Sequence, residues 1–293
     1  GAPESVLEIC AHVELGGEAK DMTPELRRII DDGFTKLSAD GYRALAVAYK
    51  HIGNDRTIYS ISDEVNLTFA GFVSFIDPPK ATARQAVQEA ETLGVDIKIL
   101  TGDNELVTAR ICERVGLKVK GVLMGQEVDT LNDDELARRA KQSTVCARLS
   151  PEQKNRIIMA LKNKGHVLGY MGDGINDAPS LRAADVGISV ENAVDIAKEA
   201  ADIILLEAGL DILDTGITEG RRTFANTMKY IMMGTSSNFG NVFSVPAALF
   251  IVPFLPMRPV QILLNNLLYD LAQVTIPTDR VDEDQIAKPR RWD

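Results

Sequence analysis

Two hydrophobic patterns alternate along residues 67–206. Short apolar runs typical of buried strands are separated by stretches in which apolar residues recur every three or four positions, as on one face of a helix. This alternation predicts βαβ units and therefore an α/β fold with an open parallel sheet. The expected strands are 67–76, 96–100, 143–148, 167–171, 186–190 and 202–206, and the expected helices include 81–93, 106–115 and 151–162.

The first 50 residues have a separate α/β pattern. A Thr-Pro start at Thr23 followed by apolar residues at helical spacing predicts a helix that ends near residue 37. The chain breaks at Gly41, and the segment RALAVAYK that follows reads as a strand.

The C-terminal quarter is more apolar than the rest. Residues 230–255 contain no charged side chain and are long enough to cross a bilayer as a helix, and residues 259–278 carry only Asp270 as a charge. The short link between them predicts a transmembrane helical hairpin, with Pro246 and Pro253 as breaks that free backbone carbonyls. A buried hairpin inside a soluble fold is the alternative.

Four polar side chains interrupt these apolar segments. Asn238 and Asn241 are three positions apart, and Asn266 and Asp270 are four apart, so each pair shares a helix face. Polar groups in a membrane span usually face an ion or a partner helix. The asparagines therefore suit either ion binding or hydrogen bonding between helices, whereas the charge of Asp270 needs compensation.

Two carboxylates lie close together in the segment MGDGINDAP. Asp173 and Asp177 follow a predicted strand, with glycines and Asn176 between them. Carboxylates this close repel unless a cation compensates them, and carboxylate oxygen is a preferred ligand of Mg²⁺. The segment is therefore a candidate magnesium and phosphate site.

A second polar loop, TGDN, follows another predicted strand. Because ligands bind at the carboxyl ends of parallel strands, we expect this loop to share the sheet edge with MGDGINDAP. Thr101 and Gly102 could offer a hydroxyl and a backbone N–H to phosphate, with Asp103 beside them, and Lys154 at the start of a helix could neutralise phosphate charge. Taken singly, TGD is a weak signal because its residues are common in turns, and a lone lysine is weaker still, whereas the GDGIND part of the other loop is far more specific.

The sequence offers no convincing nucleophile for phosphoryl transfer. Asp77 ends a strand, but Pro78 and Pro79 after it have no backbone N–H to stabilise a phosphorylated carboxylate. We expect Asp77 to be a turn or hinge residue and the attacking carboxylate to lie upstream of Gly1.

Charge and composition exclude several classes of function. The net charge of -10 and the scattered basic residues argue against nucleic acid as a partner. The three cysteines and three histidines are isolated in sequence, which argues against a disulfide framework or a zinc site.

Together these motifs resemble those of the P-type cation-transporting ATPases, most closely the bacterial magnesium transporters. GAPE at the start is similar to a motif of the family's nucleotide-binding domain, DPP to its hinge, and TGD and DGIND to its phosphorylation domain. The ending KPRRW also resembles the magnesium transporters.

This resemblance implies an architecture in three parts. Residues 1–74 would be the C-terminal part of an α+β nucleotide-binding domain. Residues 75–217 would be a haloacid-dehalogenase-like phosphorylation domain without its nucleophile segment. Residues 218–293 would form a stalk helix, two transmembrane helices and a cytoplasmic loop.

The resemblance also implies roles for individual residues, with ATP and Mg²⁺ as cofactors. Thr101 and Lys154 would contact the transferred phosphate, in a catalytic set that also includes Gly102, Asp103, Asn176 and the magnesium ligands Asp173 and Asp177. Gly1 and Arg43 would bind the nucleotide. The transported ion would be held by Asn241, Asn266 and Asp270, with Asn238 as a further ligand.

The implied function is ATP-driven Mg²⁺ transport across a bacterial inner membrane through an aspartyl phosphate. Transport of Ca²⁺ or H⁺, a membrane-anchored phosphatase and a non-catalytic ion-binding fragment are the alternatives. Because the N-terminal half of such a transporter is missing here, we expect this chain alone to form no phosphoenzyme and to transport nothing. Its partners would be ATP, the transported cation, a lipid bilayer and the missing half.

Overall fold

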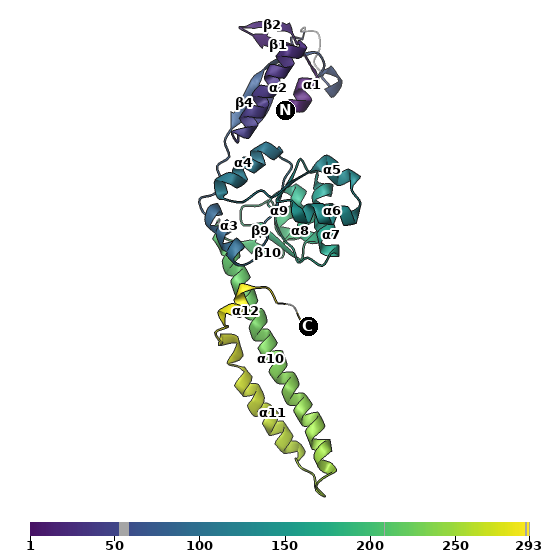
Figure 1. Cartoon of the computed structure of the whole chain (residues 1–293), viewed down its shortest axis with the longest axis vertical. Helices are drawn as coiled ribbons and strands as arrows, with labels where there is room; N and C mark the ends of the chain where they lie inside the picture. The colour runs from purple at the N-terminus through teal and green to yellow at the C-terminus, as the bar shows by residue number, and fades with distance from the viewer. Residues whose placement is uncertain (53–58, 208, 291, 293) are drawn as a thin grey trace. The chain divides into compact units, whose positions relative to one another are not determined.

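The computed structural model describes residues 1–52, 59–207, 209–290 and 292 (Figure 1). The chain divides into two compact units, and helix α3 (Ala83–Thr92) crosses the boundary between them in sequence. Unit 1 comprises Gly1–Val87 and Ile97–Gly209, and unit 2 comprises Gln88–Asp96 and Leu210–Asp293.

The N-terminal part of unit 1 is built on a four-stranded sheet in the order β2-β1-β4-β3. Strand β4 pairs in parallel with β1 and antiparallel with β3. The Thr23 side chain accepts a hydrogen bond from the Leu26 backbone nitrogen and so caps α2, which confirms the predicted helix start. The elements are α1 (Pro3–Glu8), β1 (Cys10–Leu15), β2 (Glu18–Asp21), α2 (Pro24–Ala39), β3 (Arg43–Tyr49), the 3-10 turn η1 (Ile61–Asp63) and β4 (Leu67–Phe75).

The remainder of unit 1 contains parallel strands, as the sequence predicts, but they form two sheets rather than one. The first has the order β5-β7-β6 and the second the order β10-β9-β8, with every neighbouring pair parallel. The expectation of a single open sheet is wrong because, among the described strands, none pairs with the outer edges of β5 and β8. The strands are β5 (Ile99–Leu100), β6 (Val122–Met124), β7 (Val145–Ala147), β8 (Gly169–Met171), β9 (Val186–Val190) and β10 (Ile203–Leu205).

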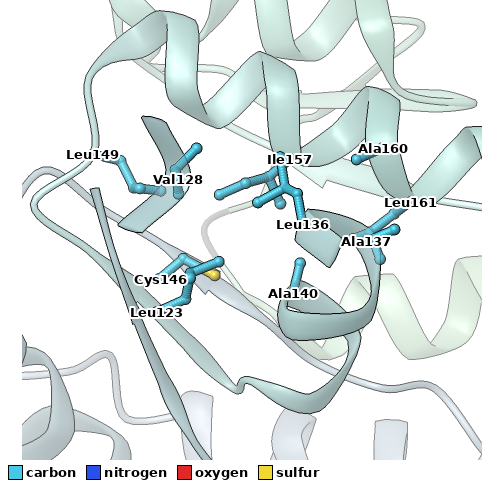
Figure 2. Close-up of a cluster of buried hydrophobic side chains, with 10 residues drawn as sticks. All are labelled: Leu123, Val128, Leu136, Ala137, Ala140, Cys146, Leu149, Ile157, Ala160 and Leu161. Carbon is cyan, nitrogen blue, oxygen red and sulfur yellow. The ribbon is translucent and has the colours of Figure 1, made fainter. Parts of the chain in front are cut away.

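Helices cover these parallel strands and enclose an apolar core (Figure 2). Leu123, Leu136 and Ile157 are fully buried there, and Leu100 and Leu168 pack against the same cluster. The predicted helix from Pro151 is confirmed as α7. The helices are α4 (Glu105–Val115), α5 (Gly125–Thr130), α6 (Asp133–Gln142), α7 (Pro151–Asn163), η2 (Ile175–Asp177), α8 (Ala178–Ala183) and α9 (Asp195–Ala200).

Unit 2 is a helical hairpin whose long arms lie side by side (Figure 1). Helix α10 (Asp211–Leu249) contains Pro246 without ending there, so the expected break at that proline is wrong. Helix α11 (Pro259–Gln273) ends earlier than residue 278, and η3 (Ile276–Thr278) and α12 (Glu283–Ala287) follow it. Among the described residues, no helix combines the length and the apolar character needed to cross a membrane, so the predicted spans are not confirmed.

Candidate functional site

The most buried ion pair between predicted site residues joins Lys154 to Asp177. Lys154 lies in the first turn of α7 and its Nζ is 2.9 Å from Asp177 Oδ1. Both side chains are nearly buried, with 15% and 14% of their surfaces exposed. Tyr170, in strand β8, donates its hydroxyl to the same Oδ1 at 2.7 Å. The pair is therefore a fixed, hydrogen-bonded cluster rather than a loose surface ion pair.

The glycines of the loop after β8 let the backbone come close to Asp177. A Cβ atom on Gly172 would lie 2.5 Å from the Asp177 Cβ, so a larger residue would force the loop to move. The Gly174 backbone nitrogen donates to Asp177 Oδ2 at 3.3 Å. Asp173 follows the same strand with its side chain exposed, and Asn176 is also exposed. The glycines thus explain how two carboxylates can share one tight loop.

Electrostatics keep Asp177 ionised. Burial raises the pKa of this carboxyl, but the hydrogen bonds from Lys154 and Tyr170 outweigh burial and hold the pKa below its usual value. Burial, and next the hydrogen bond to Asp177, raise the pKa of Tyr170. The cluster therefore carries an ionised Asp177 beside a neutral Tyr170 at physiological pH.

The TGDN loop is fixed against the end of β7. Thr101 Oγ1 accepts a hydrogen bond from the Asp103 backbone nitrogen at 3.0 Å, and the Thr101 carbonyl accepts one from Leu149 at 3.0 Å. The Asp103 carbonyl accepts from the Arg148 backbone nitrogen at 3.0 Å. Gly102 is exposed, with its backbone beside the Leu149 carbonyl. These hydrogen bonds thus fix the loop while Gly102 stays accessible to solvent.

One of the predicted nucleotide-binding residues, Arg43, lies on β3, and the other, Gly1, is hydrogen-bonded to that strand. Arg43 begins this strand, and its guanidinium pairs with the Asp103 carboxylate at 2.6 Å, although about half of the arginine side chain is exposed. Gly1 and Ala46 exchange backbone hydrogen bonds of 2.9 and 3.0 Å. The structure therefore holds Gly1 against the strand that carries Arg43, and the Arg43–Asp103 ion pair joins that strand to the TGDN loop.

Two groups of catalytic candidates remain without direct contact among the described residues. No hydrogen bond or ion pair joins Thr101 to Asp173 or Asp177. Their partners are nevertheless close in sequence, because Leu149 binds Thr101 and Lys154 binds Asp177. The segment that leads from β7 into α7 therefore connects the two loops.

The chemistry of Asp173 and Asp177 fits Mg²⁺, which prefers carboxylate oxygens and keeps several waters. Across the part of the chain that the structure describes, no group of three or more His, Cys, Asp or Glu side chains gathers in a metal-binding arrangement. Asp173 and Asp177 could supply two ligands to Mg²⁺, and its remaining ligands would be waters or phosphate oxygens.

The predicted ion ligands lie on the two arms of unit 2. The Asn241 amide nitrogen is 3.4 Å from the Asn266 side-chain oxygen, and both residues are half-buried. Asn238 and Asp270 are exposed. The structure thus brings Asn241 and Asn266 together by a weak hydrogen bond and leaves the other two candidates on the surface.

Sequence reasoning missed two features of these sites. Tyr170 occupies an apolar strand position, where tyrosine usually reads as core, and only the folded structure brings its hydroxyl to Asp177. Gln273, at the end of α11, is 5% exposed, and its buried amide nitrogen has no hydrogen-bond partner among the described residues. The sequence itself gives no pattern that distinguishes either residue.

Comparison with known proteins relates the chain to transport ATPases. Residues 1–82 match the family described as P-type ATPase, cytoplasmic domain N. The whole chain is 51% identical to the magnesium-transporting ATPase, P-type 1, of Escherichia coli K12, and 50% identical to the protein of that name from Salmonella typhimurium strain 14028s. The calcium-transporting ATPase 1 of Lactococcus lactis is 32% identical over 99% of the chain.

The chain spans 32% of the length of both magnesium-transporting relatives and 34% of the calcium-transporting one. The similarity is therefore to a part of each relative, but it extends over essentially all of this chain. The predicted family resemblance is confirmed: over its whole length the chain resembles about a third of a P-type cation-transporting ATPase, and the magnesium-transporting relatives named here share more identity with it than the calcium-transporting one.

Proposed function

We propose that this chain is part of a longer protein that transports Mg²⁺ across a membrane, driven by ATP through an aspartyl phosphate. The observation that supports this most directly is the Lys154–Asp177 pair beside Asp173, at the end of a parallel strand, in a chain half identical to magnesium-transporting ATPases. Positive charge and carboxylates placed together are what a transferred phosphoryl group and its metal require.

In this proposal the attacking carboxylate comes from the part of the longer protein that the chain does not span. Its oxygen displaces ADP from the terminal phosphorus of ATP, and water later hydrolyses the resulting acyl phosphate. Thr101 and the Gly102 N–H bind phosphate oxygens, and Lys154 offsets their charge. Mg²⁺, held by Asp173 and Asp177, neutralises charge on the phosphoryl group when it is bound.

The nucleotide lies at β3 in this scheme, where Arg43 contacts its phosphates near Gly1. Residues 1–74 then belong to the nucleotide-binding domain, residues 75–217 to a haloacid-dehalogenase-like phosphorylation domain and residues 218–293 to the stalk and membrane region. The Arg43–Asp103 ion pair supports this division because it links the nucleotide strand to the phosphate loop. When ATP binds next to the TGDN loop, Arg43 would exchange its contact with Asp103 for a contact with a phosphate of ATP.

We assign the hairpin of unit 2 to the membrane, in the bacterial inner membrane by analogy with the relatives. Large apolar side chains stand exposed along it, among them Phe243 at 64%, Leu267 at 56% and Leu271 at 66%. Exposed apolar surface of this extent is unfavourable in water and favourable against lipid. In this proposal the side chains of Asn241, Asn266 and Asp270 bind the transported ion, and Asn238 is a fourth candidate ligand.

Calcium transport is the second candidate because the Lactococcus lactis relative carries that name. Mg²⁺ is favoured since a site with one carboxylate and several amides suits a small ion that keeps part of its hydration shell. Proton transport and a membrane-anchored phosphatase remain alternatives, and the phosphatase would need its own nucleophile near the TGDN loop.

The decisive experiment measures cation uptake into vesicles that contain the full-length protein. We expect ATP-dependent uptake of Mg²⁺ rather than Ca²⁺, and its loss in Asp270→Asn. Arg280→Gln is a charge-removing control outside the helices. Calcium uptake would overturn the choice of ion, and normal magnesium uptake by Asp270→Asn would overturn the choice of ligands.

A further inference from the structure

Tyr170 combines a buried ring with a hydroxyl that reaches the proposed site. Its ring packs against the apolar cluster formed by Leu181, Ala193, Ala197 and Ala200. Its hydroxyl donates a 2.7 Å hydrogen bond to Asp177 Oδ1. The packing needs only the ring, which phenylalanine would supply equally well. The hydroxyl therefore needs a separate explanation, and its hydrogen bond to Asp177 supplies one.

The two oxygens of Asp177 are used differently. Oδ1 accepts from both the Tyr170 hydroxyl and Lys154 Nζ, at 2.7 and 2.9 Å. In the part of the chain that the structure describes, Oδ2 accepts a single, longer bond of 3.3 Å, from the Gly174 backbone nitrogen. An ionised carboxylate oxygen has two lone-pair directions, so the two strong donors saturate Oδ1 and leave Oδ2 with capacity for another ligand.

We propose that Tyr170 is a positioning residue that fixes the Asp177 carboxylate so that Oδ2 is the oxygen open to Mg²⁺. The inference rests on the proposed function, because it assumes that Asp173 and Asp177 bind the catalytic ion. Partners of this kind orient metal-binding carboxylates and maintain their affinity. Without Tyr170, the carboxylate would be held by Lys154 and by the long bond from the Gly174 backbone nitrogen, whereas a second short bond to Oδ1 restricts its rotation further.

The experiment is a titration of the full-length protein with Mn²⁺, a paramagnetic substitute for Mg²⁺, followed by electron paramagnetic resonance. All variants carry Asp270→Asn to weaken the proposed transport site. We expect Tyr170→Phe to weaken Mn²⁺ binding by roughly three- to tenfold, less than a complete loss because Lys154 still holds the same oxygen. Tyr49→Phe, a hydroxyl deletion on β3, is the matched control and should bind Mn²⁺ normally.

Steady-state kinetics provide a second readout in the protein with Asp270 intact. Tyr170→Phe should raise the Mg²⁺ concentration needed for half-maximal ATP hydrolysis while leaving the KM for ATP unchanged. A purely structural role for the hydroxyl would instead lower the amount of folded enzyme without changing the Mg²⁺ dependence.

Asp173→Asn separates the two ways in which the proposal can fail. If Asp173→Asn weakens Mn²⁺ binding but Tyr170→Phe binds it like the parent protein, the positioning role of Tyr170 is wrong and the magnesium site stands. If Asp173→Asn also binds Mn²⁺ normally, the magnesium site of the proposed function is wrong, and the role of Tyr170 is overturned with it.

Discussion

The surroundings of Asp177 in unit 1 differ from those of Asn241 in the hairpin of unit 2. Around Asp177 the polar contacts are short, convergent and backed by a closed apolar core. Around Asn241 there is one long hydrogen bond, and the neighbouring apolar side chains point outward into exposed positions. The difference teaches that the first region obtains its rigidity from its own packing, whereas the second depends on surroundings that cover its apolar surface.

The largest difference in stability between the two regions should appear when one buried and one exposed leucine are each replaced by alanine. Leu136 is fully buried in the core of Figure 2, so Leu136→Ala should lower the free energy of unfolding by about 3 kcal/mol. Leu267 is 56% exposed on α11, so Leu267→Ala should change it by less than about 0.5 kcal/mol in water. Urea unfolding of the chain measures both values. Equal losses would contradict the contrast between a self-packed and an uncovered region.

A smaller effect is expected from two glycine substitutions. In Gly172→Ala the new Cβ would lie 2.5 Å from the Asp177 Cβ, so the loop must shift, and we expect a loss of about 2 kcal/mol. Gly240, within α10, has open space around it, so Gly240→Ala should stabilise the helix by about 0.5 to 1 kcal/mol. Thermal unfolding followed by circular dichroism measures the two changes. Stabilisation by Gly172→Ala would contradict the tight packing around Asp177.

The smallest effect is a loss of stability at alkaline pH that should be confined to unit 1, which contains all three cysteines. Burial raises the pKa of Cys146 from 9.0 to about 11. Because the folded pKa lies above the unfolded one, the contribution to stability is complete below pH 9.0 and is lost as the pH rises toward 11. We expect a loss of about 1 kcal/mol by about pH 10.

Cys146→Val should reduce that pH dependence, because valine fills a similar volume and does not ionise. A smaller dependence should remain, because burial also raises the pKa of Cys112. Thermal midpoints of the parent chain and the variant between neutral and alkaline pH provide the measurement. If both lose stability equally above pH 9.0, the thiol is not the group responsible.

Local patterns in the sequence were sufficient for most elements. The helix from Pro24, the strand at Arg43, the helix from Pro151 and the strand at Val186 all appear where apolar spacing and capping residues indicate them. Helix α6 was not predicted, since most of its residues are polar and only Leu136, Ala137 and Ala140 are buried. The sequence nevertheless carries signals for this helix, because Asn132 and Glu135 form a capping box and Leu136 and Ala140 are spaced as on one helix face.

The remaining errors concern contacts between distant residues. The parallel strands form two sheets because β5 and β8 do not pair with each other. Which strands pair is not encoded in any local sequence pattern. The contact between Tyr170 and Asp177 depends on how the loop turns back at Gly172. The motif MGDGINDAP located the site, but its hydrogen-bonded arrangement required the fold.

The two separate parallel sheets have a consequence for handling the protein. On the side away from its described partner, each of β5 and β8 presents backbone N–H and C=O groups to any extended segment that comes within reach. A strand from a second copy can pair with such an edge. The isolated chain should therefore self-associate as its concentration rises.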